Sequence, residues 1–345
     1  MASSEPRAPL DAEARYRRRQ ARIGGLVLAA LVLAPLAIRD PYWQNVLILT
    51  VMYAGLAQAW NILGGYCGQI SLGQALFFGI GGYVATVLDA SAGVPTLLGL
   101  VPAGIAAALA SLLVGWPCFR MSGHYYAIAT LVVAQIGYLL FLNWDAVGGA
   151  SGIFIPYVAE SWPHLQFRSS KLPYYYAFLA LAAIVWLASY ALENSRWGFS
   201  WRAIKDDPIA AESVGVRIFR AKLVAAAASA FFTGIIGAVY AQFVAFIDPD
   251  SVLSGQLSIL ITLPAVLGGV GTLWGPALGA AILIPLSEAT RSYVGGSGSG
   301  LDLIVYGALV MVVAVAKPQG LVGLVPALQR HAAAARVRRE AARAA

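Results

Sequence analysis

The chain has 345 residues, of which 59% are hydrophobic and 11% are charged, and its formal net charge is +7. A soluble globular protein carries roughly 25% charged residues. This composition therefore excludes a water-facing surface over most of the chain and indicates that lipid is its main solvent. The positive charge points to basic residues retained in cytoplasmic loops rather than to nucleic acid, which the same charge would suggest for a soluble domain.

The histidines and cysteines form no recognisable metal or redox motif. His124, His164 and His331 are scattered along the chain, and Cys67 and Cys118 do not make a CxxC pair. We therefore expect no metal site and no cofactor, and we interpret both cysteines as small apolar fillers.

Residues 1–21 form a basic tail without a signal-peptide cleavage pattern, and we expect it to be cytoplasmic. A hydrophobic transmembrane domain is expected over residues 22–323, and a second basic cytoplasmic tail over residues 324–345. A membrane helix needs about 20 mostly apolar residues. This rule predicts, in chain order, membrane segments at Ile23–Ile38, Asn45–Leu63, Gln69–Leu88, Thr96–Trp116, His124–Leu142, Tyr174–Leu192, Lys222–Phe246, Leu257–Val270, Pro276–Ala289 and Leu301–Ala316.

The eighth and ninth segments are short, and glycines at Gly268, Gly269 and Gly271 interrupt them. Such a pair fits a re-entrant or broken arrangement as well as two full spans. The predicted fold is therefore all-α: a polytopic transmembrane helix bundle with about ten membrane segments, counted as eight full spans plus this short or re-entrant pair.

The distribution of basic residues orients the predicted spans. With the N-terminus placed in the cytoplasm and ten crossings, 19 of the 23 Lys and Arg residues fall in segments assigned inside, and 4 fall outside. Membrane proteins retain Lys and Arg on the cytoplasmic side. Both termini are thus predicted to be cytoplasmic, and removing the short pair of segments leaves this assignment unchanged.

Residues 193–221, ENSRWGFSWRAIKDDPIAAESVGVRIFRA, are too polar to cross a membrane. Asp207 followed by a proline is a helix start signal, with Asp as N-cap, and Gly215 is a good C-cap. The pattern predicts two short amphipathic helices at the cytoplasmic face, joined near Asp207, the second covering Pro208–Val214. The segment is either a solvated loop resting on the membrane or a docking surface for a cytoplasmic partner.

Polar residues also occur next to a glycine-rich break before the third predicted helix. Gly65 and Gly68 flank the break, so backbone near membrane depth must be shielded by protein or line a wet cavity. In a helix that starts at residue 69, positions 71, 74 and 78 share one face. Such residues either line a translocation path or make interhelical hydrogen bonds. The candidate path residues are Gln69, Ser71, Gln74 and Phe78.

Two further patterns are interpreted as structural. Asp89 lies near the end of a predicted span, and we expect it at the membrane interface. Small residues recur every four positions in the seventh predicted helix, which is typical of a helix-packing seam. They are Ala226, Ala230, Gly234 and Ala238.

Four stretches, in order along the chain, resemble the branched-chain amino acid (LIV-type) permease family of ATP-binding cassette (ABC) importers, specifically its M-type subunit. Three of them are Gly64–Leu88, Leu267–Gly279 and Lys317–Leu321. The fourth is the polar loop, where the matching residues are Arg196, Gly198, Arg202, Ala203, Ile204, Asp207, Ala210, Ala211, Gly215 and Lys222. The chain departs from the family pattern at three places, which are Gln74 (often His), Phe199-Ser200 and Lys205 (usually Arg).

The resemblance implies a permease subunit of the bacterial inner membrane that works with a second permease subunit, two cytoplasmic ATPase subunits and a periplasmic substrate-binding protein. It implies branched-chain or related amino acids as cargo, with urea, amides or another small polar solute as alternatives. The loop would couple the ATPases to the helices through Arg202, Ile204, Asp207, Ala210, Ala211, Glu212 and Gly215.

The motifs missing from the sequence agree with a transport subunit that is not itself an enzyme. No GxxxxGK[ST] phosphate-binding loop occurs, so ATP hydrolysis is assigned to partner subunits. An ion-coupled secondary transporter would need coupling-ion ligands at mid-membrane, and a membrane-embedded enzyme would need a catalytic constellation. The sequence supplies neither pattern, so both remain the less favoured alternatives.

Overall fold

A computed structural model of the chain describes residues 30–35, 38, 40–121, 123–157, 160–294, 307–308, 311 and 320–321. The first and tenth predicted segments fall largely outside the described residues, and so do both basic tails. Within the described residues, seven helices are long and apolar enough to cross a membrane. The chain is thus a polytopic helical membrane protein.

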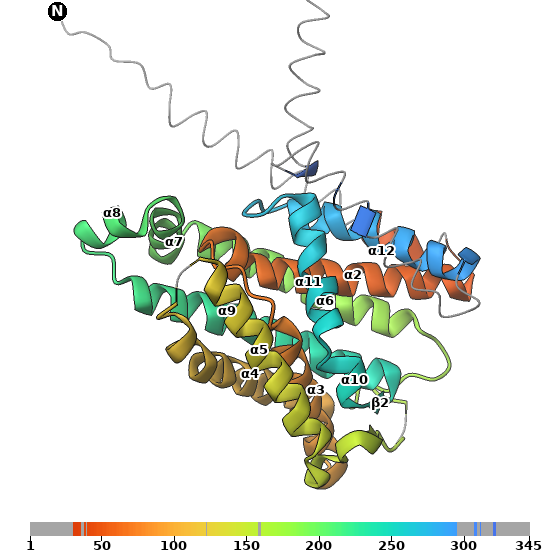
Figure 1. Cartoon of the computed structure of the whole chain (residues 1–345). Coiled ribbons are helices and arrows are strands. Elements are labelled where there is room, and N and C mark those ends of the chain that lie inside the picture. Colours follow the sequence, from red (N-terminus) through yellow and green to blue (C-terminus); the bar gives the residue numbers. More distant parts are fainter. Residues whose placement is uncertain are drawn as a thin grey trace, which may run out of the picture.

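The helices follow one another with few interruptions (Figure 1). Asp40 caps the first long one, because its Oδ1 accepts a hydrogen bond from the Tyr42 backbone N–H at 2.8 Å. The long helices and the short α10 are α2 (Pro41–Asn61) with its π-helical extension η1 (Ile62–Tyr66), α3 (Gln74–Ala92), α4 (Thr96–Cys118), α5 (His124–Leu142), α6 (Leu172–Glu193), α9 (Ile218–Val244), α10 (Pro249–Val252), α11 (Gly255–Gly268) and α12 (Gly275–Val294).

The third helix begins later than the sequence predicts. We expected it from Gln69, but α3 starts at Gln74, and the chain from residue 67 to 73 is not helical. Side chains of other helices hold this backbone: the Trp60 indole N–H donates to the Ser71 carbonyl at 2.8 Å, and Thr130 Oγ1 accepts from the Leu72 N–H at 3.1 Å. The predicted break is confirmed, whereas the shared helical face that included Ser71 is wrong.

Helix α9 forms the centre of the bundle and packs against both α3 and α4. A Cβ at Gly234 would lie 2.6 Å from the Ala107 Cβ and 3.1 Å from the Ala103 carbonyl, so only glycine permits this approach. Ala230 and Ala238 are also fully buried. The small-residue stripe is therefore the packing seam that the sequence predicts.

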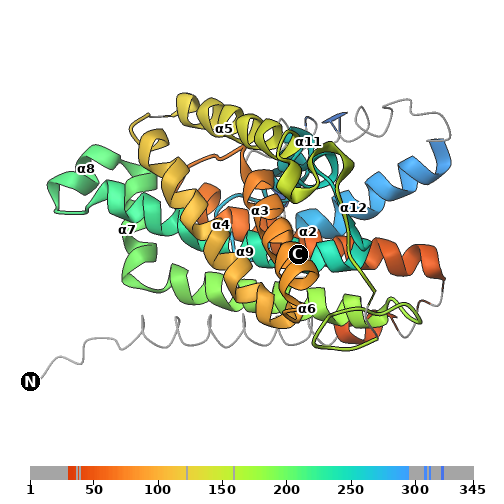
Figure 2. The same ribbon diagram turned by 90° about the horizontal axis from the view of Figure 1, so that it is seen from below.

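The outer helices present apolar side chains away from this centre. Figure 2 shows α5 at one edge of the bundle and α6 at the other. Leu113 of α4 and Ile128 of α5 are among their exposed large hydrophobic residues. Such surfaces fit lipid or another membrane-embedded subunit, which agrees with the composition of the chain.

The connection between α5 and α6 contains short elements that the all-α prediction omits. They are η2 (Asp145–Val147), η3 (Gly149–Ser151) and β1 (Ile153–Phe154), and β1 pairs antiparallel with β2 (Phe246–Ile247). Strands of two residues leave no alternating pattern to read in a sequence. Farther along, the Ser169 hydroxyl and then the backbone N–H groups of Ser169 and Arg168 donate to the Glu160 carboxylate and hold its pKa below its ordinary value.

Asp89 is a buried carboxylate near the end of α3, and its expected position at the membrane interface stays a prediction. Its carboxylate lies 3.1 Å from the His164 Nδ1 and accepts from the Gln242 Nε2 at 2.8 Å and the Thr96 Oγ1 at 3.4 Å. These partners come from α4, α9 and the α5–α6 connection. Three tertiary neighbours, all distant in sequence or across a turn, supply the hydrogen bonds that a buried carboxylate requires.

We predict that Asp89→Ala lowers the stability of the protein, because it leaves the Gln242 amide and its neighbours without their buried acceptor. A buried group left unsatisfied costs about 1–3 kcal/mol. The midpoint of thermal unfolding in detergent should therefore fall. Asp145→Ala is the control, since Asp145 is an exposed residue at the same end of the bundle. Equal midpoints for the two variants would contradict the structural role of Asp89.

Candidate functional site

Two short helices, α7 (Arg196–Asp206) and α8 (Pro208–Ser213), lie together at one end of the bundle (Figures 1 and 2). The Asp207 carboxylate caps α8, because its Oδ1 accepts hydrogen bonds from the backbone N–H groups of Ile209 at 2.8 Å and Ala210 at 3.1 Å. Gly215 follows with a φ of +90°, which favours glycine. The predicted helix pair, its junction at Asp207 and its glycine stop are confirmed, with α8 ending at Ser213, one residue earlier than predicted.

Helix α7 is attached to two membrane helices. The Trp201 side chain is fully buried, and its indole N–H donates to the Ala221 carbonyl at the start of α9 at 2.8 Å. A Cβ at Gly198 would lie 2.2 Å from the Glu193 carbonyl, so glycine lets α7 approach the end of α6. Arg202 Nη2 donates to the same carbonyl at 3.0 Å. Movement of α7 would therefore act directly on α6 and α9.

Helix α7 also reaches the glycine-rich stretches. Lys205 Nζ donates to the Gly65 carbonyl at 2.9 Å, in the π-helical end of α2. Asn61 joins this end to the turn between α11 and α12, because its Oδ1 accepts from the Gly271 N–H at 2.8 Å and its Nδ2 donates to the Thr272 carbonyl at 3.0 Å. Three of the four family-like stretches thus meet in one place.

The fourth stretch packs onto the same turn. Gly320 has a φ of +72°, and a Cβ there would lie 2.5 Å from the Gly269 Cα. A Cβ at Gly268 would lie 1.7 Å from the Gly275 carbonyl, so the turn itself is close-packed backbone. We define the candidate coupling site as α7, α8 and the nearby backbone breaks, namely residues 61–73 and 268–275.

The predicted coupling residues divide into two groups in the structure. Ile204 and Ala211 are buried against the bundle, so they hold the helices in place. The others are exposed and available to a partner: Arg202, Asp207, Ala210, Glu212 and Gly215.

Two exposed apolar residues, one in α8 and one just after it, were missed by the sequence reasoning. Ile209 is 78% exposed and Val214 is 79% exposed. A helix of six residues is too short to reveal a periodic apolar face. The available signal was two aliphatic side chains within a segment that is too polar to enter the membrane.

The candidate path residues lie deeper. Gln74 is fully buried, and its Nε2 donates to the Ser229 Oγ at 2.7 Å and the Thr233 Oγ1 at 3.0 Å on α9. Phe78 is buried too, with its ring centroid 5.3 Å from that of Tyr240. These contacts are interhelical, as one of the two readings expects, and a role in translocation stays a prediction.

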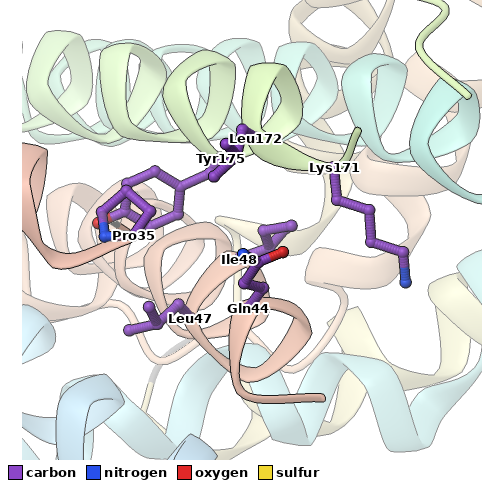
Figure 3. Close-up of a pocket in the computed structure, with 7 residues that line it drawn as sticks. All are labelled: Pro35, Gln44, Leu47, Ile48, Lys171, Leu172 and Tyr175. Carbon is purple, nitrogen blue, oxygen red and sulfur yellow. The ribbon is translucent and has the colours of Figure 1, made fainter. Parts of the chain in front are cut away.

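A recess at the opposite end of the bundle offers little chemistry. It lies between the starts of α2 and α6 and is lined by Pro35, Gln44, Leu47, Ile48, Lys171, Leu172 and Tyr175 (Figure 3). Most of these side chains are apolar. In the described part of the chain, no group of three His, Cys, Asp or Glu residues is placed to hold a metal ion.

The sequence of this chain is similar to those of several known transport permeases. The high-affinity branched-chain amino acid transport system permease protein LivM of Escherichia coli (strain K12) is 28% identical over 324 residues, which cover 86% of this chain and 74% of that protein. The corresponding LivH protein of Salmonella typhimurium is 24% identical over 297 residues, covering 81% and 94%. The guanosine ABC transporter permease protein NupQ of Bacillus subtilis is 30% identical over 117 residues, covering 33% and 35%.

No solved structure matches the chain. The family model for the permease component of branched-chain amino acid transport systems matches residues 42–314, which is most of the sequence. The chain therefore belongs to this family of ABC transporter permease components.

Proposed function

We propose that this chain is the M-type permease subunit of an ABC importer in a bacterial inner membrane. One observation carries the proposal: α7 is hydrogen-bonded to α6, α9 and the broken end of α2, and the adjoining segment exposes Ile209 in α8 and Val214 just after it. A structural element that is fixed to several membrane helices and carries exposed apolar side chains is suited to receive a partner and to pass its motion to those helices.

The partners follow from the chemistry of the chain and from its relatives. Because the sequence has no phosphate-binding loop, ATP hydrolysis belongs to other polypeptides. We propose two cytoplasmic ATPase subunits at the α7–α8 end, a second permease subunit similar to LivH within the membrane, and a periplasmic substrate-binding protein at the opposite end. We also propose that both termini are in the cytoplasm.

We propose that substrate passes next to the break between α2 and α3. Gln69 and Ile70 lie on non-helical backbone there, and Ile70 is 52% exposed. Ser71, Gln74 and Phe78 follow them in the chain and are buried. Rigid-body movement of α7 would change the exposure of the segment between α2 and α3. The substrate would then have access from one side of the membrane and later from the other.

The proposed cargo is leucine, isoleucine, valine or a related amino acid, since LivM and LivH are named for branched-chain amino acid transport. Urea, amides and other small polar solutes stay as alternatives, and NupQ is named for guanosine. Measuring the ligand affinities of the purified cognate binding protein would decide among them. A binding protein that prefers a nucleoside or urea would overturn the amino-acid assignment.

We predict that the double variant Ile209→Asp, Val214→Asp loses ATPase binding, because it puts two charges on the proposed docking surface. Charges unpaired in an interface cost several kcal/mol, so the affinity should fall at least about tenfold. Co-purification with the cognate ATPases measures this. The control is Phe154→Asp, another exposed apolar position (77%) on the opposite end. Normal ATPase binding by the double variant would contradict the proposed docking surface.

A further inference from the structure

We propose that Lys205 is the positioning residue that fixes the coupling helices against both glycine breaks, and that its ammonium transmits their movement to α2 and to the α11–α12 turn. This inference rests on the proposed function of α7 and α8. Lys205 is not among the coupling residues that the sequence predicts. The inference gives this residue a mechanical role.

The first observation is the partner that Lys205 bonds. Its Nζ donates at 2.9 Å to the carbonyl of Gly65, which lies in the last turn of the π-helical extension of α2. Carbonyls at a helix C-terminus lack intrahelical donors and carry partial negative charge, so a cation is favourable there. Lys205, which belongs to α7, therefore supplies a hydrogen-bond donor to a carbonyl at the C-terminal end of the α2–η1 membrane helix.

The second observation is that glycines make room for this side chain. A Cβ at Gly68 would lie 3.1 Å from the Lys205 Cγ, and a Cβ at Gly271 would lie 2.7 Å from its Nζ. Both glycines have positive φ, +71° and +80° respectively. Two breaks about 200 residues apart in sequence thus form a cradle around one lysine side chain.

The third observation is that Asn61 links the two sides of the cradle. It is fully buried, and it bonds the backbone of both Gly271 and Thr272. The other described anchors of α7 lead elsewhere, since Trp201 bonds α9 and Arg202 bonds the end of α6. Among the described hydrogen bonds, Lys205 thus provides the polar link from α7 to the joined breaks.

The position of Lys205 suits a link that shifts during a transport cycle. The residue as a whole is exposed, at the end of the bundle where we propose the ATPases bind. A charged group that keeps contact with water can exchange partners without being stranded in an apolar interior. A movement of α7 would therefore change the Lys205–Gly65 contact.

The test uses the whole transporter reconstituted in liposomes with its binding protein. Lys205→Met, Lys205→Arg and the control Arg220→Met are compared by substrate uptake per ATP hydrolysed. Arg220 is an exposed basic residue at the same end of the bundle. We expect Lys205→Met to assemble and hydrolyse ATP but to lower uptake per ATP at least about fivefold, the low end of measured couplings. Lys205→Arg and Arg220→Met should stay within about twofold of wild type, a difference well below such couplings.

A restored ammonium provides a second measurement. Lys205→Cys should show the same loss, and aminoethylation of the new thiol should recover uptake per ATP. Cys67 and Cys118 are buried, which limits reaction at the native thiols. Wild-type uptake per ATP in Lys205→Met would overturn the proposal, and so would failure of every Lys205 variant to assemble while Arg220→Met assembles. Failure of the wild-type chain to bind ATPases would instead overturn the proposed function.

Discussion

A Gly81→Ala variant is expected to lose most of its folded protein. The new Cβ would lie 2.1 Å from the Gly234 carbonyl oxygen and 2.4 Å from its Cα, in the contact between α3 and α9. Both atoms belong to backbone, so no side-chain rotation relieves the clash. Overpacking a core costs about 1–3 kcal/mol, and a helix pair that must separate costs more. The yield of monodisperse protein in detergent and its unfolding midpoint measure the effect.

The matched control is Gly99→Ala, in the membrane helix α4. A Cβ at Gly99 meets its nearest neighbour, the Ala85 Cα, at 3.8 Å, which is ordinary van der Waals contact. This variant should retain its yield and could gain a little stability, since alanine favours a helix over glycine by about 1 kcal/mol. Equal yields for the two variants would show that the close approach of α3 and α9 is not required.

A Gly215→Pro variant is expected to abolish binding-protein-stimulated ATP hydrolysis by the assembled transporter. Proline fixes φ near −65°, whereas Gly215 has a φ of +90°. The substitution also removes the N–H that donates to the Glu212 carbonyl at 2.9 Å. In the variant, the backbone after α8 must therefore run in another direction. The position of α8 relative to α9 then changes. Stimulation should fall at least about tenfold, as expected for loss of about 1.4 kcal/mol of coupling or more.

Gly93→Pro is the control for this second effect. Gly93 also has a positive φ (+61°), its N–H donates to the Asp89 carbonyl at 3.2 Å, and a Cβ there meets nothing within 4 Å. It lies at the other end of α3, away from the candidate coupling site. Both variants should lose similar stability, but transporters that contain Gly93→Pro should keep normal stimulation. Loss of stimulation in both would mean that a general destabilisation, rather than the place of α8, explains the Gly215 result.

The helical outline of the described chain could be predicted from local sequence. The apolar run His124–Leu142 predicts the bounds of α5 that the structure shows. The Asp207-Pro208 start signal predicts the first residue of α8. Long apolar runs are decided by the lipid solvent, and capping is decided by neighbouring backbone groups, so neither depends on distant residues. The predicted start of the third helix at Gln69 was wrong. Gln69 lies outside α3, because Trp60 and Thr130 bond the non-helical backbone before it.

The sequence by itself determined that the chain is a multi-pass membrane protein with a polar loop between two of its helices, and four family-like stretches pointed to an ABC permease. Only the tertiary structure decided that these stretches meet, with Lys205 in a cradle formed by Gly68 and Gly271. It also turned Gln74 toward α9 and buried Asp89 among partners. The reason is physical. Apolar composition and helix caps are properties of a few neighbouring residues, so they can be recognised in the sequence. A glycine that makes room for a side chain from a distant segment has no local sequence pattern that reveals this contact.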